Sequence, residues 1–204
     1  MKKAILILNT ILCLILSQYS VAQKDTSFAD INGHFVYSKK YKVALVVYYK
    51  LWKGGGDCNR SQFRTFKEFD WTAKNSDFNH QGDKGHLINA EDRAHNCKND
   101  SATFACYNII LQSANLNRGV FKINETKVRE LSQYDSLGIF YINIPSMEIF
   151  GNGVHKVIHT YKVVQSLSTG RVYFCIRFSD NPGKVEDVKL GEVYSVYPIK
   201  LKGF

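Results

Sequence analysis

The sequence contains no internal repeat, no low-complexity segment and no second block of distinct composition. These absences argue against a repeat protein and give no sign of a second domain. The chain has 204 residues, of which 45% are hydrophobic, and this is enough for one ordinary core. We therefore expect a single domain.

Closely spaced cysteines are also missing. No pair has the Cys-x-x-Cys spacing of a zinc knuckle, which disfavours a structural zinc site. Four cysteines follow the N-terminal segment, namely Cys58, Cys97, Cys106 and Cys175. In an oxidising compartment an even count favours two disulfides, and four cysteines allow three pairings that the sequence does not separate. Free buried thiols are the alternative.

The N-terminal apolar run, Ala4–Leu16, is too short to span a bilayer comfortably. It follows the basic Met1-Lys2-Lys3 and precedes the small residues Ser20-Val21-Ala22. This order is typical of a signal peptide over residues 1–22, with a mature chain over residues 23–204. We expect a periplasmic or extracellular protein with no stable membrane association after cleavage. An uncleaved N-terminal anchor is the alternative.

Acidic residues are scarcer than basic ones. The chain has 27 Lys and Arg against 18 Asp and Glu, and its net charge of +9 becomes +7 when Lys2 and Lys3 are removed. An exported basic domain favours an anionic partner, such as nucleic acid or an acidic surface. Without a long Lys/Arg block, solubility alone explains the excess equally well.

Apolar runs predict strands along much of the chain. The predicted strands are Val43–Tyr49, Ile139–Ile144, Lys156–Val164, Val172–Phe178 and a short run within Glu192–Leu201. The segment Asn59–Gln81 is polar with scattered aromatics and predicts a long surface loop. Strands beside helices without a regular βαβ alternation favour an α+β domain with a mostly antiparallel sheet.

The segment Asn117–Tyr134 predicts a helix. Phe121, Val128 and Leu131 recur at spacings that give a helix one buried stripe, and Gly138 is expected to stop it. The helix therefore has one apolar side that faces the core.

Three polar residues recur on another side of this predicted helix. Asn117, Glu125 and Arg129 are separated by eight and then four residues, which are close to whole helical turns. The polar run Asp83-Lys84-Gly85-His86 lies upstream. One histidine, one amide, one carboxylate and one guanidinium form a plausible set for cleaving a phosphodiester with a single hard metal ion.

The run Asp83–His86 resembles the Asp-Arg-Gly-His signature of the DNA/RNA non-specific endonucleases, the group that includes the Serratia-type secreted nuclease and mitochondrial endonuclease G. Upstream, Ala73–Asp77 followed by Phe78 and Gly82 resembles the segment that leads into that signature. Tyr107–Gly119 resembles the family's Ser-Asn-x-x-Pro-Gln segment running into Leu-Asn-Gln-x-x-Trp. Glu125 and Arg129 fall where the family has its Glu and Arg. The joint order of these motifs is far more specific than any one of them.

The resemblance implies a ββα-metal (His-Me finger) core and an Mg²⁺-dependent endonuclease, with Mn²⁺ or another divalent cation as the alternative metal. Such an enzyme hydrolyses DNA and RNA with little sequence preference, because it contacts the phosphate backbone. By the same resemblance, His86 is the general base, Asn117 is the metal ligand, and Glu125 orients metal-bound waters. The products would carry 5′-phosphates.

The resemblance also suggests residues that bind substrate. Arg129 and Arg64 would bind phosphate oxygens, and Arg60 is the second choice to Arg64. Asn108 and Gln112 match polar positions near the family site, where they would shape the site by hydrogen bonding, bind substrate, or simply cap loops. The sequence predicts neither an inhibitor protein nor an oligomeric state.

Three positions depart from the family pattern. Lys84 stands where the family usually has Arg, so its proposed contact with phosphate loses a bidentate fork. Leu111 replaces a proline and Phe121 a tryptophan, without removal of a catalytic atom. Two other functions stay open. One is a nucleic-acid-binding protein that has lost catalysis, and the other is a phosphodiesterase of narrower substrate range.

Overall fold

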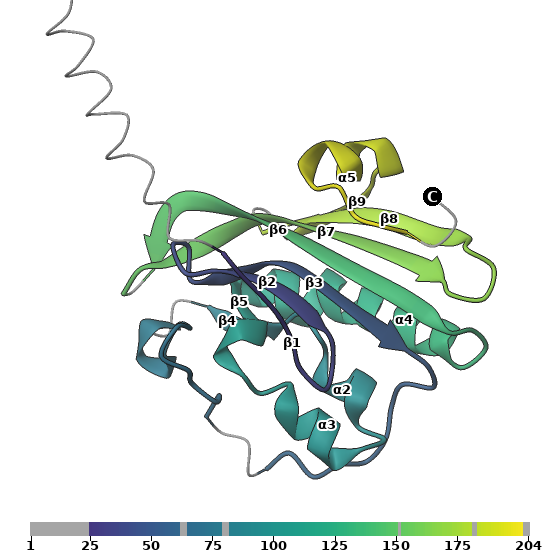
Figure 1. Ribbon diagram of the computed structural model, residues 1–204, viewed down its shortest axis with the longest axis horizontal. Helices are drawn as coiled ribbons and strands as arrows, with labels where there is room; N and C mark the ends of the chain where they lie inside the picture. Colours follow the sequence, from purple (N-terminus) through teal and green to yellow (C-terminus); the bar gives the residue numbers. More distant parts are fainter. Residues whose placement is uncertain (1–24, 62–64, 79–81, 151, 181–182, 202–204) are drawn as a thin grey trace, which may run out of the picture.

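The computed structural model describes residues 25–61, 65–78, 82–150, 152–180 and 183–201 (Figure 1). The predicted signal peptide, residues 1–22, and Arg64 lie outside the described residues. No helix in the described ranges is long and apolar enough to cross a membrane.

A seven-stranded sheet dominates the molecule, in the order β1-β2-β3-β6-β7-β8-β9, and every neighbouring pair is antiparallel. Its strands are β1 (Thr26–Ala29), β2 (His34–Ser38), β3 (Val43–Leu51), β6 (Leu137–Phe150), β7 (Val154–Ser166), β8 (Val172–Ser179) and β9 (Lys184–Asp187). The four long strands predicted from apolar runs are confirmed as β3, β6, β7 and β8.

A second layer covers one face of this sheet (Figure 1). It contains the antiparallel pair β4 (Asp83–His86) and β5 (Ile109–Gln112), followed by helix α4 (Lys122–Ser132). Two short helices, α2 (Ala90–Arg93) and α3 (Cys97–Ala102), and the 3₁₀ turns η1 (Asn75–Phe78) and η2 (Cys106–Asn108) complete the layer. Two strands and a helix in this order give the ββα unit that the motifs predict.

The predicted helix over residues 117–134 is confirmed, with a different start and end. Its first part is a π-helix, η3 (Leu116–Phe121), in which Gly119 has non-helical backbone angles. The helix α4 ends at Ser132, and Gly138 lies in β6. Phe121 and Val128 are buried in the main core, as the apolar stripe predicts.

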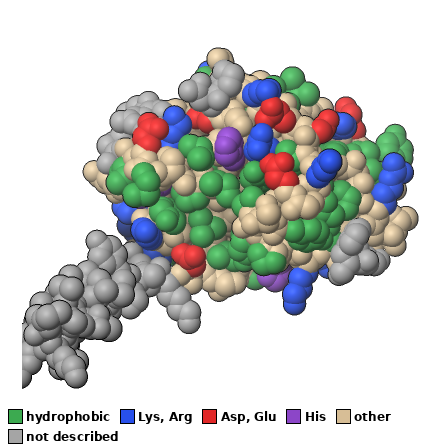
Figure 2. Space-filling view, turned by 90° about the horizontal axis from the view of Figure 1, so that it is seen from above, with side chains coloured by type: hydrophobic (Ala, Val, Ile, Leu, Met, Phe, Trp, Pro, Cys, Tyr) green, Lys and Arg blue, Asp and Glu red, His purple; other side chains and the backbone are tan. Residues whose placement is uncertain are grey.

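The prediction of a strand within Glu192–Leu201 is wrong, because this region contains helix α5 (Leu190–Val196). Leu190, Val193, Tyr194 and Tyr197 recur at helical spacing and pack on a second apolar cluster, on the opposite face of the sheet from α4. Figure 2 looks onto this opposite face, where acidic and basic side chains are interspersed. Arg177, for example, pairs with Glu186 at 2.7 Å and with Glu192 at 2.9 Å.

The described parts of Asn59–Gln81 have little regular structure, as predicted, but they are more than a surface loop. They hold only the 3₁₀ turn η1 and one isolated bridge from Lys67 to Ala105. Ala73 and Phe78 are fully buried in the main core. Ala73 and Phe78, with the partly buried Phe66, Phe69 and Trp71 that pack against the same core, therefore anchor this irregular segment to the domain.

The prediction of two disulfides is half right. Cys58 and Cys97 form a disulfide with their Cα atoms 5.4 Å apart. Cys106 and Cys175 are buried free thiols. Cys106 belongs to the main core and Cys175 to the cluster under α5, so the sheet separates the two thiols.

Candidate active site

The strand β4 directs its side chains to two sides because successive residues of a strand alternate. Asp83 faces the π-helix, where its carboxylate accepts hydrogen bonds from Asn117 Nδ2 at 3.1 Å and from Arg118 Nε at 2.7 Å. The hydrogen bonds from Arg118 are the main reason why the pKa of Asp83 lies below its usual range. Asp83 thus ties β4 to the start of the helix that carries Asn117.

Gly85 lies under the side chain of Gln112. A Cβ atom at position 85 would lie 2.0 Å from Gln112 Oε1, so any larger residue here would displace the Gln112 side chain. Gln112 is 2% exposed, and its amide atoms have no hydrogen-bond partner within the described ranges. Gln112 therefore shapes the ββ pair from inside, and its direct contact with substrate stays a prediction.

His86 packs against two phenyl rings. Its ring centroid lies 5.3 Å from that of Phe66 and 4.9 Å from that of Phe104. His86 Nε2 is buried and makes no hydrogen bond to any described residue. Burial, and to a lesser extent the positive charge of Arg60, lowers the pKa of His86 to about 4. The imidazole is therefore neutral at physiological pH.

A cavity of about 630 Å³, here called the charged cavity, lies beside α4. Its lining residues carry charges or amides: Arg60, Asn89, Glu91, Asn117, Arg118, Lys122, Glu125 and Arg129. The structure therefore brings Asn117, Glu125 and Arg129 together, as their helical spacing predicts. Arg60 belongs to this cavity and also acts on the charge state of His86, so it links the two.

Buried charges support the inner wall of the charged cavity. Arg129 Nη1 pairs with Asp92 Oδ1 at 3.1 Å, and the Tyr49 hydroxyl donates to Asp92 Oδ2 at 2.8 Å. Lys162, on β7, is only 1% exposed and lies over the Tyr141 ring at 5.0 Å from its centroid. Two acids and two bases, Asp92, Glu125, Arg129 and Lys162, thus form one buried charge cluster.

The members of this cluster shift one another's pKa values. Burial raises the pKa of Glu125 to about 7, against the opposing effects of a hydrogen bond from Asn89 and of the charges of Lys162 and Arg129. Burial lowers the pKa of Lys162 to about 8, while Glu125 and Asp92 favour its charged form. Burial therefore disfavours the ionised form of Glu125, and an added cation in the cavity would favour that form.

The donor set of the charged cavity fits a hydrated divalent cation. The described residues contain no group of three or more His, Cys, Asp or Glu that would form an all-protein metal site. Mg²⁺ instead keeps most of its waters and needs only one or two protein oxygens. Because Asn117 Nδ2 already donates to Asp83, the amide oxygen of Asn117 is the atom left to bind a cation. The carboxylate of Glu125 lines the same cavity.

Arg60, the second choice for a phosphate-binding arginine, is the one that the structure places in the charged cavity. Its guanidinium contacts Glu91 Oε2 at 2.6 Å and Asp100 Oδ1 at 3.0 Å. Arg64, the first choice, lies outside the described residues.

Lys84 and Asn108 do not line the charged cavity. Lys84 Nζ lies 5.2 Å from the ring centroids of both Phe66 and Phe78, on the side of β4 that carries His86. Asn108 is 1% exposed and donates to Ile88 O and Thr103 O, each at 2.9 Å. Asn108 thus fixes the backbone just after His86, and a direct contact of either residue with substrate stays a prediction.

Sequence reasoning missed Lys162, Asp92 and the two rings beside His86. Lys162 left a signal, because it is a charged residue between Tyr161 and the apolar pair Val163-Val164. A lysine in such a run has either an exposed edge position or a buried partner. Asp92, Phe66 and Phe104 left no comparable signal, since their roles depend on contacts between distant segments.

The chain is similar to known proteins in both sequence and fold. The chain matches the DNA/RNA non-specific endonuclease family over residues 19–182. A chain in the crystal structure of the EndoG/EndoGI complex, which addresses EndoG inhibition, has the same fold with a TM-score of 0.69 and 19% sequence identity. The likeness covers 88% of this chain and 86% of that chain. No curated protein matches the sequence. The predicted α+β fold is thereby confirmed.

Proposed function

The chain belongs to the DNA/RNA non-specific endonuclease family, and from that premise we propose that it is an exported, Mg²⁺-dependent enzyme that hydrolyses DNA and RNA with little sequence preference. The main observation behind the proposal is that Asn117, Glu125 and Arg129 line one cavity together with Arg60. The positive charge of Arg60 also contributes to the lowered pKa of His86. Substrate would bind through its phosphate backbone, which carries no base identity.

His86 is the general base in this proposal. Its neutral imidazole accepts a proton from a water molecule while the water oxygen attacks phosphorus. The bond from phosphorus to the 3′ oxygen breaks, so the products carry a 5′-phosphate and a 3′-hydroxyl. The low pKa of His86 supports this role because the residue is already deprotonated at neutral pH.

The Asn117 amide oxygen would hold the divalent cation, and Glu125 would accept hydrogen bonds from its waters. When bound, Mg²⁺, or Mn²⁺ as the alternative, supplies positive charge to the phosphate and to the leaving oxygen. The place of Glu125 in the buried charge cluster supports this assignment, since Lys162 and Arg129 favour its ionised form.

Arg129 and Arg60 would bind phosphate oxygens. Both line the charged cavity, and both are already held by acidic partners, Arg129 by Asp92 and Arg60 by Glu91 and Asp100. Such pairing fixes a guanidinium in place before substrate arrives. We still propose that Arg64 contacts phosphate, because of the family resemblance alone.

We also propose that residues 1–22 are removed on export and that residues 23–204 form the mature domain in the periplasm or outside the cell. The Cys58–Cys97 disulfide supports an oxidising destination, because such bonds persist mainly outside the cytoplasm.

Plasmid nicking and RNA digestion test the proposal. Wild type should cleave both substrates with Mg²⁺ and neither with EDTA. His86→Ala should lower the rate about 10²- to 10⁴-fold, and Asn117→Ala should lower the affinity for Mg²⁺. The exposed His95 offers a matched control, and His95→Ala should cleave as wild type does.

Four outcomes would contradict the proposal. Full activity of His86→Ala would remove the general base, and full activity of Asn117→Ala would remove the metal assignment. Salt-sensitive binding without metal-dependent cleavage would instead favour a protein that only binds nucleic acid. Faster turnover of a dinucleotide than of long duplex would favour a narrower phosphodiesterase.

A further inference from the structure

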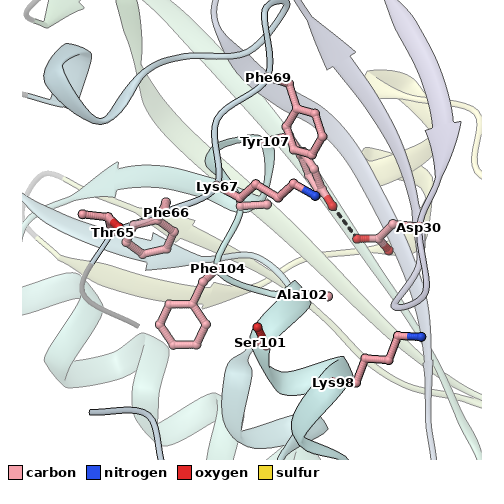
Figure 3. A pocket seen from close by; sticks show the side chains of 11 residues that line it. Asp30, Thr65, Phe66, Lys67, Phe69, Lys98, Ser101, Ala102, Phe104 and Tyr107 are labelled. Carbon is pink, nitrogen blue, oxygen red and sulfur yellow. Dashed lines mark hydrogen bonds between the residues drawn. The ribbon is translucent and has the colours of Figure 1, made fainter. Parts of the chain in front are cut away.

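A second cavity, of about 550 Å³ and here called the aromatic cavity, is lined by residues of the loop before β4, the α3 region and the loop after β1 (Figure 3). Four aromatic side chains and two lysines define its character: Phe66, Phe69, Phe104, Tyr107, Lys67 and Lys98. Figure 3 shows Phe66 and Phe104 together on one side, with Tyr107 and Asp30 across from them.

The aromatic cavity adjoins the proposed general base. Phe66 and Phe104 line it, and the same two rings contact the His86 imidazole at centroid distances of 5.3 and 4.9 Å. Both rings are only half-buried, so they present surface to the cavity as well as to His86. A flat group held against these rings would lie one ring away from the proposed reacting centre.

The charges around the aromatic cavity favour an anionic ligand. Lys67 and Lys98 are exposed at its edge. The one acidic residue, Asp30, accepts hydrogen bonds on both carboxylate oxygens, from Gly33 N at 2.8 Å and from the Tyr107 hydroxyl at 2.6 Å among others. The carboxylate is thus occupied within the protein, and the two ammonium groups remain to meet a negative charge.

The rings of the aromatic wall are held by contacts with one another. The rings of Phe69 and Tyr107 lie 5.5 Å apart, and Trp71 stacks on Tyr107 at 6.0 Å with an interplanar angle of 11°. Lys67 Nζ lies 5.1 Å from the Phe69 ring centroid. A preformed wall of this kind binds a flat ligand without a cost for ordering the side chains.

We propose that the aromatic cavity binds an unpaired nucleobase of the substrate, next to the cleaved bond, with the backbone phosphate of that nucleotide beside Lys67 and Lys98. The inference rests on the proposed function and deepens it. Every base has a flat face that stacks on aromatic rings, so this contact is independent of sequence. A base in a duplex must first leave its stack, and the site therefore favours single-stranded DNA or RNA.

Binding is measured with a single-stranded oligonucleotide that contains 2-aminopurine, in EDTA so that no cleavage occurs. Stacking on the cavity rings should quench the fluorescence of the probe. Phe66→Leu and Phe104→Leu keep an apolar side chain beside His86 but remove the aromatic face, and each should weaken binding about tenfold and reduce the quenching. Phe66→Tyr should bind as wild type does. The exposed Trp52 lies outside the cavity, so Trp52→Leu serves as a matched control.

Cleavage with Mg²⁺ gives the second readout. In both leucine variants kcat/KM should fall about ten times further on a single-stranded oligonucleotide than on the matching duplex. An equal fall on both substrates would mean that the rings only hold His86, and would overturn the inference. Unchanged quenching in both leucine variants would overturn it as well.

Variants of the exposed lysines provide a second test if a leucine variant fails to fold. Lys67→Ala and Lys98→Ala should each weaken binding of the single-stranded probe, and wild-type binding by both would count against the site. The proposed function fails separately, through absence of Mg²⁺-dependent cleavage by the wild type, whereas quenching in EDTA reports on the cavity alone.

Discussion

The charged cavity and the aromatic cavity are built on opposite physical principles. The charged cavity depends on a buried charge cluster, in which burial disfavours the charged forms of Glu125 and Lys162 and each of the two favours the charged form of the other. The aromatic cavity depends on uncharged rings, and its basic groups, Lys67 and Lys98, stay in solvent. A charged group that acts on a reacting bond must be partly removed from water, so the fold has to compensate the free-energy cost of burying it. A charged group that only attracts a polyanion can stay hydrated at the surface.

The largest expected effect comes from breaking the buried cluster. Lys162→Met should lower the free energy of unfolding by about 3–5 kcal/mol, because Glu125 and Asp92 lose a buried cationic neighbour. Urea unfolding at pH 7 measures the change. Lys50→Met, at an exposed position of β3, is the matched control and should stay within about 0.5 kcal/mol of wild type. A loss below about 1 kcal/mol for Lys162→Met would mean that the cluster does not depend on this lysine.

The disulfide joins the two cavities, and its removal ranks next. Cys58 lies two residues before Arg60, which lines the charged cavity, and Cys97 precedes Lys98 of the aromatic cavity. Cys58→Ser with Cys97→Ser should lower the free energy of unfolding by about 2–4 kcal/mol, since a long chain segment is no longer closed in the unfolded state. Dithiothreitol should destabilise wild type by a similar amount and leave the double variant unchanged.

The response to acid separates His86 from Glu125. The folded pKa of His86, about 4, lies below its unfolded value of 6.5, so the unfolded chain binds more protons and stability falls as pH drops from 6.5. Glu125 acts in the opposite direction, because its pKa of about 7 exceeds its unfolded value of 4.5. Between pH 6.5 and 5, the His86 contribution is about 2 kcal/mol.

His86→Gln should therefore remove about 2 kcal/mol of acid destabilisation between pH 6.5 and 5, while Glu125→Gln should increase the net loss on acidification. Urea midpoints at the two pH values test both variants. The same pH slope in His86→Gln and in wild type would show that the histidine is not held neutral by burial.

The smallest expected effect concerns salt. Single-strand binding releases counterions in proportion to the phosphates neutralised, so Lys67→Ala and Lys98→Ala should each reduce the slope of log K against log salt by about 0.7. Titrations in EDTA at several salt concentrations measure the slope. A change in affinity without a change in slope would mean that these lysines do not contact phosphate.

Much of the site could be predicted because it depends on local sequence. The spacing of Asn117, Glu125 and Arg129 placed them on one side of a helix, and the structure gathers them in one cavity. The π-helical turn before α4 was not predicted, although it changes the register between Asn117 and the other two residues. Local periodicity identifies the side of a helix but not an irregular turn within it.

The errors have two physical sources. The apolar run within Glu192–Leu201 predicts a strand because of its valines and tyrosines, yet Leu190, Val193 and Tyr194 follow a helical period and lie in helix α5. Tertiary packing outweighs intrinsic strand preference in so short a segment. The second disulfide failed for a different reason: the pairing of cysteines depends on which face of the sheet each one occupies, and chain spacing does not reveal this.

The pairing of β3 with β6 aligns Leu51 with Leu137 and brings together the two ends of the segment that carries the whole ββα unit. Lys53 N also donates to Ser132 O at 2.9 Å, which closes this segment at its base. In topological terms the ββα unit, the charged cavity and every lining residue of the aromatic cavity except Asp30 belong to an insertion between two adjacent strands. Its length and contents can therefore diverge in evolution without any change in the strand order of the sheet that supports it.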